Sequence, residues 1–443
     1  MKIQLSDNFN YKKLLLFTVP SIVMMIFTSV YGVVDGFFVS NFVGKTPFAA
    51  LNFIMPFLMI LGSIGFMFGA GGGALVAKTL GEQRKQKANE LFSLFIYVTA
   101  VIGTTVAALG IVFIRPVAAL LGAEGAMLDY SVIYGRIILA ALPLYMFQME
   151  FQTFFIVAEK PQLGLAVTVL SGICNMVLDW LFMAVLKWGL VGAAAATAIS
   201  QAIGGIVPLV YFFGKNSSLL RLVKTKYDGG AILRACTNGS SELMSNISMS
   251  LVGMLYNAQL IAFAGEDGVA AYGVMMYVGF IFVAAFIGYS TGVSPVIGYH
   301  YGAGNHTELK NLLKKSIVII SAFSIGMFVL AEVFALPLSK IFVSYDKTLL
   351  DLTVRGFMIY SFSFLFSGIA IFGSAFFTAL NNGIVSAVIS FLRTLVFQVV
   401  TVLSFPVIWG IDGIWYSTVV AEGLAVVITV VFIICMRKRY KYM

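Results

Sequence analysis

Two acids and one amide occur in segments that are otherwise apolar enough to lie inside a lipid bilayer. Asn175 and Asp179 are four residues apart in SGICNMVLDW, so a helix would place them on one face. Asp35 occurs in the apolar stretch YGVVDGFFV, although its nearness to the segment end also allows solvation at the membrane surface. Carboxylate and amide oxygens bind hard cations, and neighbouring carboxyl groups can share a proton. These residues predict an intramembrane cation or proton site, and the alternative is a buried hydrogen-bond network that only ties helices together.

Three further charged residues lie in apolar segments and are candidates for contact with a substrate. Glu150, beside Gln148 in YMFQMEFQTFF, could line a cavity and attract cations, or could extend its carboxylate to the nearby membrane surface. Glu242 is open to the same two interpretations. Arg393 lies deeper, where it could pair with Glu422 or with a carbonyl at a helix end, or could bind an anionic group.

The residues that commonly bind metals give no such pattern in this sequence. His300 and His306 occur in one polar loop without a Cys or acidic companion at metal-ligand spacing. Cys174, Cys236 and Cys435 are scattered, which indicates neither a metal site nor a disulfide framework. We therefore expect no cofactor, and no metal other than sodium at the cation site.

The composition indicates that membrane-spanning helices position these residues. The chain has 443 residues, of which 60% are hydrophobic and 11% charged, with a mean hydropathy of +0.98. Such a sequence is typical of an integral membrane protein, and recurrent apolar stretches of about 20 residues predict membrane-spanning helices. We predict an all-α membrane protein with twelve spans, at residues 11–40, 46–72, 91–114, 130–157, 162–186, 189–214, 232–264, 268–296, 309–336, 349–379, 384–406 and 412–436.

The basic residues predict how the helices are oriented. Most of the 28 Lys and Arg fall at the termini and in the loops that twelve spans place on the same side as the termini. Because basic loops stay in the cytoplasm, both termini are expected to be cytoplasmic. The net charge of +9 follows from these flanking residues, so no nucleic-acid partner is implied.

The sequence repeats itself at an offset of 221 residues. WGLVGAAAATA at 188–198 aligns with WGIDGIWYSTV at 409–419, which pairs Thr197 with Thr418. The repeat predicts two pseudo-symmetric six-helix lobes, residues 1–214 and 231–443, joined by a cytoplasmic linker at 215–230. An even number of spans gives both lobes the same orientation, and transporters built from such parallel repeats move substrate by rocking one half against the other around a central cavity.

The two halves differ at the candidate site. Asp35 aligns with Tyr256, whereas Asn175 and Asp179 align with valines, so only the first half keeps the acids. No P-loop for nucleotide binding is present, so active transport would depend on an ion gradient.

The chain resembles the multidrug and toxic compound extrusion (MATE) transporters. The resemblance covers nearly the whole sequence and rests on the two six-helix halves, Pro20 and Asp35 in the first helix, and Asn175 and Asp179 in the fifth. In prokaryotic members the corresponding acids, amide and a threonine form a proton or cation site in the N-terminal lobe, and Thr197 matches that threonine. The resemblance implies an antiporter, not an enzyme, that admits H⁺ or Na⁺ and exports amphiphilic, mostly cationic drugs. It also implies a functional monomer in the cell membrane of a prokaryote, with a bend at Pro20 that responds to protonation of Asp35.

The sequence is also compatible with two other functions, and it departs from the family pattern in one respect. A lipid-linked precursor flippase of the same superfamily would need several basic residues in its cavity, whereas only Arg393 lies well within a span. An intramembrane enzyme could use Asp35 and Asp179 as a catalytic pair, but full duplication favours alternating access. Some family members carry a C-terminal cation site with acids in helices seven and ten. Here Glu242 could supply the first, and Asp351 lies only at the mouth of the tenth span.

Overall fold

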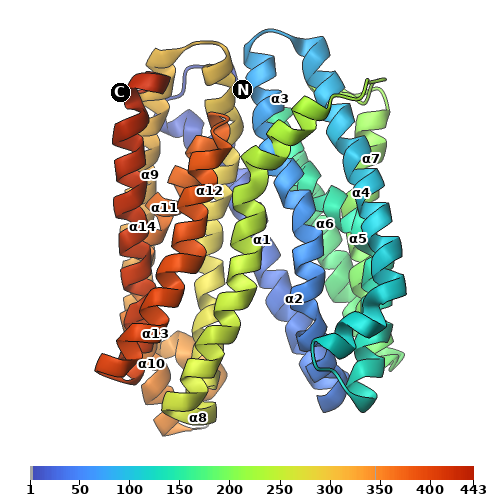
Figure 1. Cartoon of the computed structure of the whole chain (residues 1–443), viewed down its shortest axis with the longest axis vertical. Helices are drawn as coiled ribbons and strands as arrows, with labels where there is room; N and C mark the ends of the chain where they lie inside the picture. Colours follow the sequence, from blue (N-terminus) through green and yellow to red (C-terminus); the bar gives the residue numbers. More distant parts are fainter. Residues whose placement is uncertain (1–2, 345) are drawn as a thin grey trace.

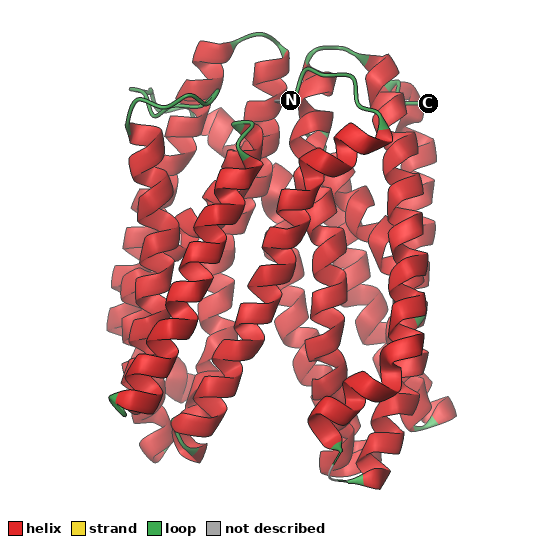
Figure 2. Cartoon of the chain, turned by 180° about the vertical axis from the view of Figure 1, so that it is seen from behind, coloured by secondary structure: helices red, strands yellow, loops and turns green. Residues whose placement is uncertain are grey.

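The chain folds entirely into helices and connecting loops over the residues that the structure describes. The computed structural model describes residues 3–344 and 346–443, so residues 1, 2 and 345 of the predicted lobes lie outside the description. Figure 2 shows helices joined by short loops, without β-strands in the described part of the chain.

The helices of the first half end near the predicted boundaries, with two extensions. The second span continues nine residues beyond its predicted end at 72, and the third is six residues longer at each end than 91–114. Two spans contain short π-helical segments. The elements are α1 (Tyr11–Phe42), α2 (Lys45–Met67), π-helical η1 (Phe68–Gly72), α3 (Gly73–Gly81), α4 (Lys85–Leu120), α5 (Gly125–Val157), α6 (Pro161–Asp179), π-helical η2 (Trp180–Val185) and α7 (Gly189–Phe213).

The second half begins earlier than predicted, since its first helix starts at Gly229 inside the expected linker. The predicted tenth span is not one straight helix, because α10 and α11 meet at an angle of 48°. The elements are α8 (Gly229–Gly302), α9 (His306–Val343), α10 (Lys347–Ser361), α11 (Phe364–Ala379), α12 (Gly383–Phe391), π-helical η3 (Leu392–Val396), α13 (Phe397–Trp409) and α14 (Ile411–Tyr440).

Polar side chains at the loop ends determine where several helices begin. Asn10 accepts a hydrogen bond of 2.8 Å from the backbone N–H of Lys13 at the start of α1. Asp228 accepts one of 2.9 Å from Ala231 at the start of α8. These side chains satisfy N–H groups that have no partner within the helix, which stabilises the helix start.

The described helices make twelve membrane spans. Ten helices are long and apolar enough to cross a bilayer, and the bent pair α10 and α11 makes one more. The long helix α8 is two spans, because Gly265 has φ 61° and ψ −149° and interrupts the helical backbone. A positive φ is easily adopted by glycine, so the chain reverses direction there. The prediction of an all-α protein with twelve spans in two six-helix lobes is confirmed.

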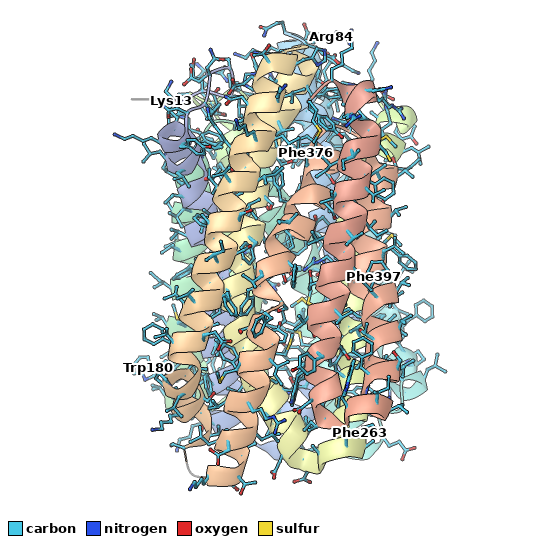
Figure 3. The ribbon with its side chains drawn as sticks, turned by 90° about the vertical axis from the view of Figure 1, so that its left-hand side faces the viewer. Lys13, Arg84, Trp180, Phe263, Phe376 and Phe397 are labelled. Carbon is cyan, nitrogen blue, oxygen red and sulfur yellow. The ribbon has the colours of Figure 1, made fainter. Side chains whose placement is uncertain are left out.

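The two lobes meet at one end of the molecule and diverge toward the other. Both termini lie at the end where the lobes meet, and the ribbons separate toward the opposite end (Figure 1). Figure 3 shows Lys13 and Arg84 near the end with the termini, and Trp180 and Phe263 near the opposite end. Basic residues at one end and exposed tryptophan at the other are typical of a protein that crosses a membrane along this axis.

Close helix contacts hold the lobes together at the end with the termini. A Cβ atom added at Gly239 of α8 would lie 1.9 Å from the carbonyl oxygen of Met67, and one added at Gly81 would lie 2.0 Å from that of Tyr299. Only glycine therefore allows the backbones of α2, α3 and α8 to approach this closely.

The segment before α1 also connects the lobes. The N–H of Leu5 donates to Oε1 of Glu159, between α5 and α6, and the N–H of Phe9 donates to Oε1 of Glu308 in α9. Both distances are 2.8 Å, and the side chains of Leu5 and Phe9 are buried. Leu5 and Phe9, which precede α1, thus bond to both halves at the closed end.

Candidate ion-binding site

The first lobe brings together the two acids that the sequence singled out. α1 packs against α6, and the carboxyl groups of Asp35 and Asp179 lie within hydrogen-bonding range of each other. Asp179 is 0% exposed, and neither of its oxygens receives a hydrogen bond from any donor among the described residues. The buried Oδ1 of Asp35 is also without a donor. Two carboxylates bond to each other only through a shared proton or cation, so this pair is suited to bind one.

Asn175 adds an amide one helical turn before Asp179. Asn175 is 2% exposed, and its Oδ1 is buried without a hydrogen-bond partner in the described part of the chain. The helix changes to the π-helical η2 immediately after Asp179. π-helical turns occur frequently at functional sites, because they disturb the regular helix hydrogen bonds and redirect nearby side chains.

Two tyrosines beside the acids were not identified from the sequence. Tyr134 of α5 is buried and interacts electrostatically with both Asp35 and Asp179, while Tyr31 of α1 interacts with Asp35. The hydroxyl of Tyr134 has only a weak contact of 3.8 Å, with Sδ of Met55. Tyrosine is common in apolar helices, so only the packing of α5 on the acids distinguishes Tyr134.

Thr197 does not bond directly to the acids in this conformation. It is half-buried in α7, and its backbone carbonyl accepts a 2.8 Å hydrogen bond from the hydroxyl of Ser200. No hydrogen bond joins the Thr197 hydroxyl to an acid among the described side chains. Its membership of the site stays a prediction.

Pro20 lies within a continuous α1 and is buried where this helix meets the second lobe. The neighbouring Ser21 and Thr18 pack against Gly292 of α8. Proline removes one helix hydrogen bond, so α1 lacks a backbone bond at this interface between lobes. Pro20 is fifteen residues from Asp35, and a bend that responds to protonation stays a prediction.

The second lobe has a satisfied network at the position equivalent to the acid pair. The hydroxyl of Tyr256 donates to Oε1 of Gln398 at 2.7 Å and lies 2.9 Å from the hydroxyl of Thr418. The repeat aligns Tyr256 with Asp35 and Thr418 with Thr197. The contact between Tyr256 and Thr418 therefore supports a location of Thr197 close to Asp35.

Arg393 forms an ion pair in the second lobe. Its Nε donates to both carboxylate oxygens of Glu422, at 3.0 and 2.9 Å, and the two side chains are 18% and 6% exposed. Arg393 belongs to the π-helical η3 and also interacts electrostatically with Glu242 of α8. Of the alternatives that the sequence left open, the structure shows pairing with Glu422.

Comparison with known families decides what kind of protein carries these two lobes. The family model described as MatE matches residues 20–181 and again residues 243–403, which together make more than half of the chain. This chain belongs to the MatE family. The two matches are about half a chain apart, in agreement with the internal repeat, and the chain is therefore a MATE-type efflux transporter.

Relatives and solved structures agree with this assignment over nearly the whole MATE chain. It is 25% identical to "Multidrug export protein MepA" of Staphylococcus haemolyticus, covering 97% of this chain and 94% of the relative. Identity to the protein of the same name in Staphylococcus aureus (strain MRSA252) is 22% with the same coverage. A solved outward-facing conformation of a multidrug resistance MATE family transporter of the MOP superfamily has a TM-score of 0.92, at 21% identity and 98% coverage of both chains.

The remaining candidates of the MATE chain are placed in different surroundings. Glu150 and Gln148 are buried inside the first lobe, at 0% and 4% exposure, so contact with a substrate would require another conformation. Glu242 is half-buried beside Arg393. Asp351 is exposed at the open end, where it lines a pocket with Arg355 and Asp412.

The two acids that could form a cation site in the second lobe, Glu242 in the seventh span and Asp351 in the tenth, do not lie together. Glu242 lies in the first part of α8, toward the end with the termini, while Asp351 lies near the start of α10 at the opposite end. A second acid near Glu242 is instead Glu422, which already pairs with Arg393.

Proposed function

We propose that this MATE transporter is a secondary active antiporter that exports amphiphilic, mostly cationic compounds in exchange for protons. The observation that carries the proposal is the contact between the buried carboxyl groups of Asp35 and Asp179. The names of the relatives, which describe multidrug export, support a broad substrate range.

A shared proton would couple ion binding to the arrangement of the helices. With one proton between them, Asp35 and Asp179 can remain in contact away from water. Without it, their repulsion and the cost of burying charge favour separation and entry of water. Because Asp35 is on α1 and Asp179 is on α6, proton binding and release would favour different positions of these helices.

The arrangement supports a proton over sodium and an exporter over a lipid flippase. The two carboxyl groups lie within hydrogen-bonding range of each other, which suits a shared proton, whereas sodium also needs further oxygen ligands such as that of Asn175 to join the pair. A lipid-linked phosphate would need free basic residues, whereas the charge of Arg393 is already paired with Glu422.

We further propose that the chain works as a monomer in the cytoplasmic membrane of a prokaryote, with both termini in the cytoplasm. Support comes from the basic residues near the end with the termini, including Lys13 and Arg84, and from a single chain that supplies both lobes. Protons would then enter from the outside, where the lobes diverge.

The proposal can be tested with purified protein in proteoliposomes. Transport of the cation tetraphenylphosphonium would be measured under an imposed proton gradient and, separately, an imposed sodium gradient. We expect the proton gradient alone to drive transport, and the variants Asp35→Asn and Asp179→Asn to lose it. Asp129→Asn is the matched control, since Asp129 is an exposed acid of the same lobe that pairs with Arg115. Transport driven by sodium alone, or retained in both site variants, would refute the coupling mechanism.

A further inference from the structure

Glu150 is a buried acid that the proposed mechanism does not use. It lies in α5, it is 0% exposed, and both carboxyl oxygens are buried without a hydrogen bond that satisfies normal geometry. The Glu150 carboxyl group interacts with the hydroxyl of Thr99 in α4, which is also 0% exposed and also lacks another partner among the described residues. Among the described residues, Thr99 is thus the side chain that interacts with this carboxyl group.

The surroundings of Glu150 are apolar and tightly packed. A Cβ atom added at Gly69 of η1 would lie 3.2 Å from Cα of Glu150, so the backbone of this π-helical segment runs directly alongside. Phe95 and Phe151, which flank Thr99 and Glu150 on α4 and α5, are both fully buried. No charged or titratable side chain from α2, α3, α4, α6, α7 or α8 interacts with Glu150 within the described ranges.

An ionised carboxylate cannot be stable in this position. A buried charge requires an opposite charge or several hydrogen bonds, and a group without them is neutral instead. In the conformation described here, Glu150 therefore carries a proton, which it can donate to the Thr99 hydroxyl.

The fold itself does not require an acid at this position. At the 221-residue offset, Glu150 aligns with Ile371 and Thr99 aligns with Ile320. Ile320 is fully buried in the core of the second lobe. The same scaffold thus packs isoleucine where the first lobe has a carboxyl and a hydroxyl group, so the polar pair serves something other than packing.

Glu150 is separate from the acid pair. It is sixteen residues beyond Tyr134 on α5, or about 24 Å along the helix toward the end with the termini. The adjacent η1 interrupts the span formed by α2 and α3, and such segments are sites of local rearrangement. Movement of this span on α5 would give water access to Glu150 from the side of the termini.

We infer that Glu150 is a second proton-binding site of the first lobe. It would hold a proton while the lobes are open away from the termini and release it to water on the termini side when η1 moves, leaving a carboxylate. This inference rests on the proposed antiport, and it adds one proton to each transport cycle beyond the proton of Asp35 and Asp179.

Two measurements on the full-length protein test this inference. In lipid nanodiscs, the infrared spectrum of the wild type would be compared with that of Glu150→Gln, which keeps the shape of the side chain. We expect a carbonyl band of a protonated carboxylic acid in the wild type that is missing from Glu150→Gln, whereas the band of the proton shared by Asp35 and Asp179 remains in both proteins. In proteoliposomes, the number of protons exchanged per tetraphenylphosphonium would be measured. It follows from the tetraphenylphosphonium gradient that just stops net transport against a given proton gradient. We expect the ratio to fall by one proton in Glu150→Gln.

The outcomes separate this inference from the proposed antiport. A band that is absent from the wild type, or a ratio that Glu150→Gln leaves unchanged, would overturn the second site. Absence of proton-driven transport in the wild type would instead refute the antiport. In that case, a Glu150 carboxyl band that persisted through a full pH titration would also refute release of its proton.

If Glu150→Gln does not fold, Thr99→Val keeps the acid and removes its partner. We then expect a shifted carboxyl band and a shifted pH profile of transport, whereas an unchanged band and profile would overturn the inference.

Discussion

The equivalent polar sites of the two lobes differ in whether their groups have partners. In the first lobe, Asp35 and Asp179 face each other without a donor from elsewhere in the described chain. In the second lobe, Tyr256 bonds to Gln398 and Thr418, and Arg393 is paired with Glu422. The duplicated scaffold thus carries one site that gains from binding a cation or proton and one that is already satisfied.

This difference indicates a division of roles between the lobes. A pocket with unpaired acids changes its energy strongly when a proton enters, whereas a neutral or paired network does not. We therefore expect the first lobe to respond to the proposed coupling ion and the second to serve mainly as a stable partner in the proposed movement of one lobe against the other. On this view, the polar groups of the second lobe stabilise the fold while those of the first lobe affect coupling.

The largest effect on stability is expected at the ion pair of the second lobe. Glu422→Gln removes the buried carboxylate that pairs with the half-buried Arg393, and we expect a loss of about 3–5 kcal/mol in the free energy of unfolding. Unfolding by denaturant in detergent micelles measures this loss. Replacing Arg393 and Glu422 together by leucine should restore most of it, and Asp179→Asn, which removes an acid without a charge partner, should cause no comparable loss. Equal losses in Glu422→Gln and Asp179→Asn would contradict the comparison.

The two buried tyrosines provide a smaller test of the same contrast. Tyr256→Phe removes the donor to Gln398, and we expect a loss of about 1–3 kcal/mol because a buried acceptor is left unsatisfied. Tyr134→Phe removes only the weak contact with Met55, so its stability should remain near that of the wild type while proton-driven transport falls. Unfolding and transport measured on both variants would show whether stability and coupling separate between the lobes in this way.

The aligned threonines should show a smaller contrast. Thr418→Val removes a hydroxyl that contacts Tyr256, with an expected loss of about 0.5–1.5 kcal/mol in the free energy of unfolding. Thr197→Val should cause no measurable loss of stability, because its hydroxyl has no bond to the acids in this conformation. If Thr197 belongs to the ion site, the same variant should shift the pH dependence of transport, and an unchanged profile would exclude Thr197 from the site.

The smallest effect on stability is expected at Asp228, which caps α8 where the chain passes from the first lobe to the second and belongs to neither polar site. The N–H of Ala231 donates to Asp228 and, with Lys87 nearby, lowers the pKa of this carboxyl below its usual range. We expect Asp228→Ala to lower stability by about 0.5–1 kcal/mol at neutral pH through loss of the helix cap. Because the folded pKa is the lower one, this contribution is present above the unfolded pKa of about 4 and disappears as the pH falls through the folded value. Denaturant unfolding of the wild type and Asp228→Ala at neutral pH and at a pH below the folded pKa measures this contribution. A difference in stability that persists at the acidic pH would contradict this explanation.

The sequence by itself determined the class of fold and pointed to the residues of the candidate site. Apolar runs long enough to span a bilayer require helices, so the twelve spans followed from length and composition. The repeat predicted two lobes, and the rarity of acids in such segments identified Asp35 and Asp179. The same alignment paired Thr197 with Thr418 before any contact was known.

Only the tertiary structure decided which of these groups have partners. The sequence left Arg393 open between an ion pair and an anion site, and the packing of η3 against α14 places it on Glu422. It could not distinguish Tyr134 from other tyrosines, or show that Glu150 faces Thr99 inside the lobe and not a cavity. The physical reason is that hydropathy reports only whether a segment lies in the membrane. The energy of a buried polar group depends on which side chains the neighbouring helices bring within hydrogen-bonding distance.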